Sequence, residues 1–140
     1  MDLWYNIPKS ECSGLAELTV DTYEKQAELL KALAHPVRLR ILEILAQEES
    51  CVCHLTTILD QRQPYVSQHL MLLREVGLVL DRKEGAIVYY RLVDKRVMES
   101  IVLTRELLRA RGVDGRASPI PRSPVNGCPC PKCGAEGVCR

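Results

Sequence analysis

A mainly α-helical fold with one small β-hairpin is predicted from three features of the sequence. Apolar residues recur at helical spacing over much of residues 21–76, a pattern typical of amphipathic helices around a shared core. The pattern changes at 78–83 and 86–92, where Val, Ile, Leu and Tyr flank Glu84-Gly85, as in a hairpin. A last helix is expected from about 94 to 111, before Gly112. The hairpin would therefore lie between two helices.

The first two helices are separated by His35-Pro36. Helix 21–34 opens with Asp21 and Glu24, the spacing of a capping box. It ends before Pro36, because the residue before a proline is driven out of the α region. Pro36 then suits the first turn of helix 36–47, which His35 is expected to cap.

Two further helices are predicted on either side of the polar turn 60–63. Ser50 can cap helix 51–60, which carries Leu55, Ile58 and Leu59. Pro64 opens helix 64–76, and Gly77 follows its end. Val66, Leu70 and Leu73 form the apolar face of this helix. Its polar face comprises Gln63, Tyr65, Ser67 and Gln68, together with Met71.

The order of helices and hairpin predicts a winged helix-turn-helix. In such folds the second helix of the motif, here 64–76, enters the major groove of DNA. Glutamine can pair with adenine edges and serine can donate or accept. The pattern alone fits equally well an amphipathic helix with a polar face. The net charge of +1 adds no basic footprint.

Both ends of the chain are expected to lie outside this domain. Residues 1–20 are interpreted as an N-terminal arm, residues 21–111 as the DNA-binding and dimerisation domain, and residues 112–140 as a linker with a cysteine-rich tail. No secretory signal and no apolar run of membrane-spanning length is visible, so a cytoplasmic location is expected. The seven cysteines would then be thiols or metal ligands rather than disulfides.

Residues 31–92 resemble the ArsR/SmtB family of metal-responsive repressors. The segments KALAHPVRLRILEIL, ESCVCHL and LDQRQPYVSQHLMLLREVGLVLDRK carry the resemblance, and the last is most similar to the arsenic-responsive branch. The resemblance implies a homodimer that binds double-stranded operator DNA, with the first and last helices at the dimer interface. It places DNA-reading residues at Gln63, Ser67 and Gln68, and directs Arg82 and Lys83 of the wing toward phosphates. Tyr65 and His69 lie on the same helix; His69 is interpreted as either DNA-facing or packed between helices.

The family's first metal box corresponds here to Glu49-Ser-Cys-Val-Cys-His-Leu55, which retains Cys51 and Cys53. The third cysteine of the arsenic branch is replaced by Thr56. The second metal box retains only Asp94, so a zinc or cobalt site on the last helix is not expected. His54 is interpreted as a surface residue rather than as a ligand.

Thiolates select soft ions, which favours As(III) or Sb(III) as the inducer, with Cd(II), Pb(II) or Zn(II) as the alternative. Cys51 and Cys53 are expected in the first turn of a helix, where its N-terminus favours thiolates. Two residues span about 200° of an α-helix. Both sulfurs could therefore reach one ion only if the turn unwinds, which would shift the attached helix 64–76.

The third thiolate is left open between Cys12 of the arm, which is slightly favoured, and the tail. A 16-residue linker reaches at most about 53 Å, so Cys128, Cys130 and Cys133 are also within range. These three could equally bind a separate ion or pass one on. A thiol-redox sensing repressor is the remaining alternative. An enzyme is not expected, because no cysteine pair opens a βαβ unit.

Overall fold

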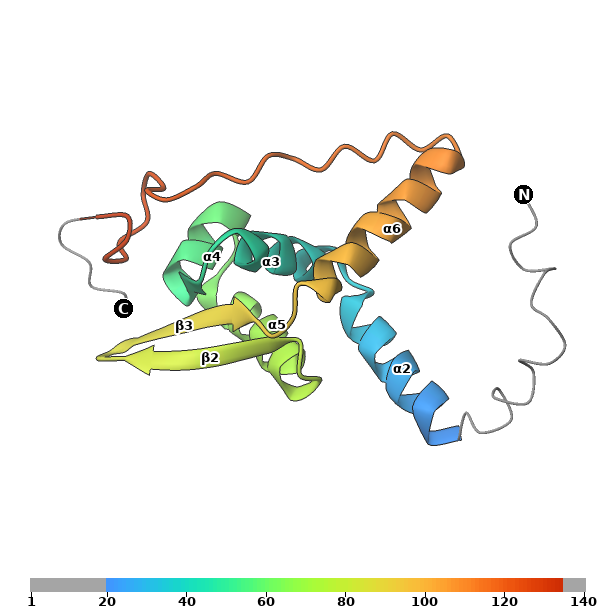
Figure 1. Cartoon of the computed structure of the whole chain (residues 1–140). Coiled ribbons are helices and arrows are strands. Elements are labelled where there is room, and N and C mark those ends of the chain that lie inside the picture. Colours follow the sequence, from blue (N-terminus) through green and yellow to red (C-terminus); the bar gives the residue numbers. More distant parts are fainter. Residues whose placement is uncertain (1–19, 135–140) are drawn as a thin grey trace, which may run out of the picture. The chain divides into compact units, whose positions relative to one another are not determined.

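A computed structural model describes residues 20–134 as helices followed by a hairpin and one further helix (Figure 1). The elements are α2 (Val20–Leu33), α3 (Pro36–Gln47), β1 (Ser50–Cys51), α4 (Val52–Leu59), α5 (Gln63–Glu75), β2 (Val79–Glu84), β3 (Ile87–Leu92) and α6 (Arg96–Ala110). The described residues divide into two units, the first ending at Lys31 and the second beginning at Ala32. This order confirms the predicted winged helix-turn-helix, and most boundaries lie within two residues of those expected.

The junction before α3 follows the predicted capping. His35 is extended, and its Nδ1 accepts a hydrogen bond from the backbone N–H of Val37 at 3.2 Å. Pro36 occupies the first turn, where a missing N–H costs nothing. The buried face of α3 then supplies Ile41, Leu42, Ile44 and Leu45 to the core.

The helix-turn-helix consists of α4 and α5. Asp60 ends α4 in the left-handed conformation with φ 51°, which turns the chain toward α5. Val66, Leu70 and Leu73 of α5 are completely buried, as their spacing predicts, and Leu55 of α4 is buried with them. Apolar burial on this scale stabilises by about 1.5–3 kcal/mol per side chain.

The sheet has three strands in the order β1-β3-β2, all antiparallel. Gly77 has φ 75° and lets the chain leave α5, with the N–H of Leu78 donating to the carbonyl of Leu73 at 2.9 Å. β2 and β3 form the wing through the register Val79↔Leu92 to Glu84↔Ile87. β1 was not predicted: it is only two residues long and has no period that a sequence pattern could reveal.

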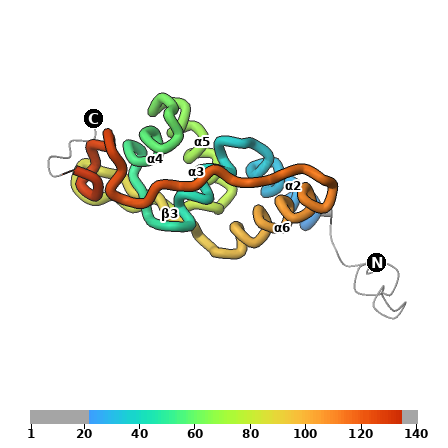
Figure 2. Tube along the Cα trace, turned by 90° about the horizontal axis from the view of Figure 1, so that it is seen from above, coloured from blue at the N-terminus to red at the C-terminus, as the bar shows by residue number. Residues whose placement is uncertain are grey.

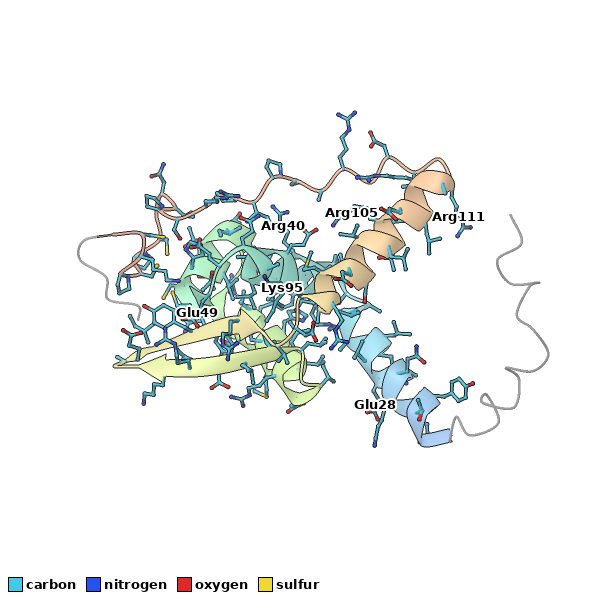
Figure 3. All side chains as sticks on the ribbon, viewed as in Figure 1. Glu28, Arg40, Glu49, Lys95, Arg105 and Arg111 are labelled. Carbon is cyan, nitrogen blue, oxygen red and sulfur yellow. The ribbon has the colours of Figure 1, made fainter. Side chains whose placement is uncertain are left out.

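A partly buried ion pair joins α6 to α3. The guanidinium of Arg105 donates to the carboxylate of Glu43, and Arg40 lies 3.6 Å from the same carboxylate. Arg40 and Arg105 are labelled in Figure 3. Ile101 of α6 is buried against the core. Thus α6 packs on α3. The segment that follows begins at the C-terminal end of α6 (Figure 1).

Candidate metal-thiolate site and DNA-binding surface

The polar face of α5 is exposed, as the sequence predicts. Gln63, Tyr65 and Gln68 are exposed and Ser67 is half-buried, on the side opposite Val66 and Leu70. Within residues 20–134, Gln63 and Gln68 are open to solvent and Ser67 partly so, and the role of these three residues in reading DNA stays a prediction.

His69 is packed between helices. Its side chain is 9% exposed, its ring centroid lies 4.5 Å from that of His35, and Tyr65 meets it edge-on at 4.6 Å. Burial lowers the pKa of His69, and the neighbouring His35 and Arg38 add to this effect. Of its two expected roles, packing is the one this environment favours.

On the wing, Arg82 is exposed but has acidic partners. Its guanidinium binds the carboxylate of Glu49 at 2.5 Å and that of Glu84 at 2.6 Å, and it lies 5.1 Å from the ring centroid of Tyr89. These hydrogen bonds raise its pKa further. Lys83 is also exposed. Phosphate contacts by Arg82 and Lys83 remain predictions, and for Arg82 they would compete with Glu49 and Glu84.

Cys51 and Cys53 occupy different elements, which corrects the expectation that both lie in a helical turn. Cys51 ends β1, pairs with Tyr89 of β3 and serves as the N-cap of α4 with extended backbone. Cys53 lies in the first turn of α4. The 200° separation therefore does not apply, because Cys51 follows strand geometry. Both side chains are buried. Cys53 is disulfide-bonded, which corrects the expectation that the cysteines are thiols or metal ligands, so this cysteine must be reduced before its sulfur can bind an ion.

The segment after α6 runs back along α3 to the end of the domain that holds β1 and α4 (Figures 1 and 2). Arg40 donates to the carbonyls of Ser118 and Pro119, the latter at 2.9 Å. The side chain of Ile120 packs against the core. The predicted linker thus makes specific contacts along its course.

Near the end of this path, two residues of the α3–β1 connection hold the tail, Glu48 through its carboxylate and Glu49 through its backbone carbonyl. The carboxylate of Glu48 accepts hydrogen bonds from Ser123, at 2.6 Å from the hydroxyl and 3.1 Å from the backbone N–H. These bonds outweigh the effect of burial and lower the pKa of Glu48. Lys132 donates to the carbonyl of Glu49 and lies 5.5 Å from the ring centroid of Tyr89.

The tail brings its cysteines to Cys51 and Cys53. Cys128 and Cys130 are buried in one cluster with the two cysteines of the box and Tyr89, and Cys133 packs against them. Among residues 20–134, the ligand atoms of His54, Cys128, Cys130 and Cys133 all lie within 4.8 Å of one another. In the part of the chain that the structure describes, three tail cysteines therefore join the metal box.

His54 is at the centre of this group, which corrects its interpretation as a surface residue. Only 2% of its side chain is exposed. Its Nδ1 lies 3.2 Å from the sulfur of Cys133, and its Nε2 lies 3.6 Å from a carboxylate oxygen of Glu48. The sequence held one signal for it: His54 directly follows the Cys-x-Cys pair, and neutral imidazole joins thiolates in metal sites.

The thiols differ in how readily they ionise. Burial raises the pKa of Cys51, and raises that of Cys128 to about 12. Burial acts on Cys130 too, but hydrogen bonds from Cys128 and Cys133 lower its pKa overall. Cys130 is thus more easily converted to thiolate, the form that binds metals, than Cys51 or Cys128. Cys12, the other candidate for the third thiolate, lies outside the described residues.

No helix within residues 20–134 is both long and apolar enough to cross a bilayer.

Asp94 is the residue retained from the second metal box. Its carboxylate accepts a hydrogen bond from the backbone N–H of Arg96 at 2.8 Å and another from the guanidinium of Arg96. These bonds lower its pKa to about 2. Its carboxylate therefore serves the start of α6.

The chain is similar to known regulators of transcription. It is 46% identical over 89 residues to an uncharacterized HTH-type transcriptional regulator of Methanocaldococcus jannaschii, covering 63% of this chain and all of the relative. It is 56% identical over 66 residues to the arsenical resistance operon repressor of Escherichia coli K12, covering 46% of this chain and 56% of the repressor.

A solved structure gives the same fold. The homodimeric winged helix-turn-helix DNA-binding domain of a Mycobacterium bovis protein, described as a possible ArsR-family regulator, has a TM-score of 0.61 and 28% identity over 74% of this chain and 94% of that one. Residues 35–80 match the pattern described as "Bacterial regulatory protein, arsR family". These relatives are regulators of transcription rather than enzymes. The chain belongs to the arsR family of bacterial regulatory proteins.

Proposed function

We propose that this transcriptional repressor of the ArsR/SmtB family binds operator DNA as a homodimer and is released by As(III) or Sb(III) held by cysteine thiolates. The observation that carries the proposal is the buried cysteine cluster at the junction of β1 and α4, adjoining the helix-turn-helix, which offers its thiolates once Cys53 is reduced. Soft thiolate ligands select thiol-seeking ions. The similarity to the arsenical resistance operon repressor supports the metalloid.

Cys51 and Cys53 are the proposed centre of the inducer site. They line a pocket of about 120 Å³ whose wall also includes Gln63, the first residue of α5. Cys130 is the proposed third thiolate, because its side chain hydrogen-bonds with that of Cys51. Cys12 remains the alternative predicted from the sequence.

Release would follow from the position of Cys51 between two elements. Cys51 is paired with β3 of the wing and also caps α4, and α4 packs on α5. Drawing the two sulfurs toward one ion changes the β1–α4 junction and, through α4 and Gln63, the placement of α5. Two half-sites lie about 34–36 Å apart on DNA, so a small displacement costs contacts in both. The ion favours the released form by its higher affinity for that form.

The homodimer is supported by apolar side chains left exposed on the two helices expected at the interface. On α2, Tyr23 is 56% and Leu30 is 53% exposed, and on α6, Leu103 is 59% and Leu107 is 60% exposed. Exposed apolar groups of this kind mark interaction surfaces. The related Mycobacterium bovis domain is a homodimer. Sedimentation equilibrium of the whole chain tests this part of the proposal.

Substituting either cysteine of the box tests the inducer site. We expect Cys51→Ser and Cys53→Ser to leave operator affinity unchanged but to abolish release by arsenite, because both side chains are buried rather than on the exposed face of α5. Thiols are kept reduced, and release is followed by fluorescence anisotropy of labelled operator. Thr57→Ser is the matched control, since it alters the same helix but keeps the hydroxyl bonded to the carbonyl of Cys53.

Parallel titrations with antimonite, Cd(II), Pb(II), Zn(II) and an oxidant alone distinguish the alternatives. Release by a divalent ion at lower concentration than arsenite would replace the metalloid in the proposal. Release by oxidant in the absence of any ion would favour a thiol-redox sensor. If either cysteine variant released operator at the same arsenite concentration as the wild type, the inducer would bind elsewhere.

A further inference from the structure

We infer that His54, Cys128, Cys130 and Cys133 form a four-coordinate site for a divalent cation of the zinc type, which fastens the C-terminal tail to the DNA-binding domain. This site differs from the inducer site in its ligands, its charge and its role. It rests on the proposed function only in sharing Cys130 with it. Its existence is tested below without any inducer.

The first argument is the match between the ligand set and tetrahedral coordination. Three cysteines and one histidine are a common zinc ligand set, and Cys130-x-x-Cys133 has the spacing of its cysteine pairs. With Zn–S bonds of about 2.3 Å, neighbouring sulfurs of a tetrahedral site lie about 3.8 Å apart. The ligand atoms here already lie within 4.8 Å of one another, so closing around an ion needs only small movements.

The second argument is the environment of the histidine. Among the described residues the buried Nε2 of His54 has no hydrogen-bond partner, whereas Nδ1 faces the sulfur of Cys133. The Glu48 carboxylate is 3.6 Å from that nitrogen. A histidine that binds a metal through one ring nitrogen typically gives the N–H of the other to a carboxylate. Glu48 is positioned for this role.

The third argument is that the tail is shaped for the site. The N–H groups of Cys133 and Gly134 both donate to the carbonyl of Cys130 at 2.9 Å, which forms a tight turn around the pair. The N–H of Val125 donates to the sulfur of Cys133 at 3.2 Å. Ser123 in turn binds Glu48. One chain of contacts thus runs from the tail through Glu48 to His54 and back to the tail cysteines.

Packing alone does not account for this arrangement. A buried cysteine is often only a small apolar filler, and Tyr89 and Ile87 do pack here. An apolar filler, however, needs no imidazole aimed at a sulfur and no carboxylate behind it. As(III) takes three thiolates, whereas a borderline divalent cation accepts nitrogen and sulfur together. The chemistry of the donors therefore points to the divalent cation.

The test uses the whole chain, reduced and freed of metal, titrated with Co(II) as a spectroscopic probe. We expect one equivalent per chain, with sulfur-to-cobalt charge transfer and the intense visible bands of tetrahedral cobalt, displaced by Zn(II). His54→Gln and Cys133→Ser should weaken binding at least tenfold and alter the bands. Glu48→Gln should weaken it about tenfold, the usual loss for the partner of a ligating histidine.

Cys51→Ser is the matched control, because its sulfur lies outside the four-ligand set while it touches the same cluster. It should bind Co(II) within about twofold of wild type. Octahedral spectra, no binding, or loss in Cys51→Ser with retention in His54→Gln would overturn the inference. Circular dichroism shows whether each variant is folded. If a variant is not folded, its titration is replaced by tryptic digestion of the wild-type chain. Zn(II) should slow the cleavage after Arg122 at least fivefold.

The two proposals fail separately. Co(II) binding is measured without operator DNA or arsenite, and release of operator by arsenite, in the wild type and in the box variants, is measured without Zn(II). A protein that binds Co(II) as expected but ignores arsenite keeps the site and loses the proposed inducer. A protein that is released from operator by arsenite but does not bind Co(II) as expected keeps the proposed inducer and loses the four-ligand site.

Discussion

At the scale of single residues, the same side chain serves different ends according to its surroundings. Burial raises the pKa of the Cys128 thiol to about 12, whereas hydrogen bonds to the sulfur of Cys130 lower its pKa despite burial. His54 and His69 are both buried, yet one faces a thiol and a carboxylate and the other faces aromatic rings. Residue type therefore defines which chemistries are open, and the neighbours select among them.

Gln68 offers a test of base reading on the exposed face of α5. We expect Gln68→Ala to weaken operator binding by about 1–3 kcal/mol, the value of a good bidentate base contact. Binding to unrelated DNA should change little, because it depends on phosphate contacts. Anisotropy titrations on both DNAs at one salt concentration measure the difference. Gln61→Ala is the control, since it removes the same side chain from the turn before α5. Equal losses on both DNAs would exclude a base contact by Gln68.

At the scale of elements, α5 has two faces with separate tasks. Its exposed face carries Gln63 and Gln68, and its buried face carries Leu70, Leu73 and His69. His69 connects the helix to the His35 cap of α3 by ring contact. The position of the recognition helix thus depends on an uncharged imidazole between two helices.

This contact makes stability sensitive to pH. Burial lowers the pKa of His69 below its ordinary 6.5, so below that pH the unfolded chain binds protons that the folded chain does not. The free energy of unfolding should therefore be undiminished above pH 6.5 and fall as the pH decreases below that value. In His69→Phe, which keeps an aromatic ring beside His35 and Tyr65, the fall should be smaller.

Urea unfolding of reduced, metal-free protein between pH 7.5 and 5.5 measures this dependence. His54, whose pKa burial also lowers, contributes with the same sign, so the slope should decrease but not vanish. His35 and Arg38 are the other titratable or charged groups that act on His69. An unchanged slope in His69→Phe would show that His69 titrates normally in the folded protein.

At the scale of the whole described unit, the last part of the chain returns to the metal box. The segment after α6 passes along α3 by way of Arg40 and reaches Glu48, where Ser123 binds (Figures 1 and 3). Two proposed sites then meet at one residue, Cys130. Occupation of one site should therefore change the affinity of the other, and by linkage the effect is reciprocal.

Zinc should accordingly oppose the metalloid. We expect release of operator by arsenite to require at least fivefold more arsenite when the chain is loaded with one equivalent of Zn(II), because Cys130 is then committed to the four-ligand site. The measurement is the arsenite midpoint in the anisotropy assay with and without Zn(II). In His54→Gln, which keeps every thiol, the zinc effect should largely disappear. An equal zinc effect in both proteins would show that the sites do not compete through Cys130.

Local patterns were sufficient to predict the helices, the hairpin and the recognition helix. His35-Pro36, Asp60 with its turn, and Gly77 interrupt the chain through backbone sterics that act within a few residues. Val66, Leu70 and Leu73 are buried because helical spacing places them on one face. The Cys-x-Cys box was recognisable for the same reason, since its residues are adjacent in the chain.

The composition of the thiol cluster depends on contacts between distant residues. His54 and Cys133 are 79 residues apart, as are Arg40 and Pro119, and no period or spacing encodes such pairs. The strand β1 exists because Tyr89 and Tyr90 offer it backbone partners, and this removes Cys51 from the helix in which its position would otherwise place it. The proposed soft-metal chemistry could therefore be predicted from the cysteines in the sequence, whereas the assembly of the tail cysteines around His54 follows from the return of the tail along α3.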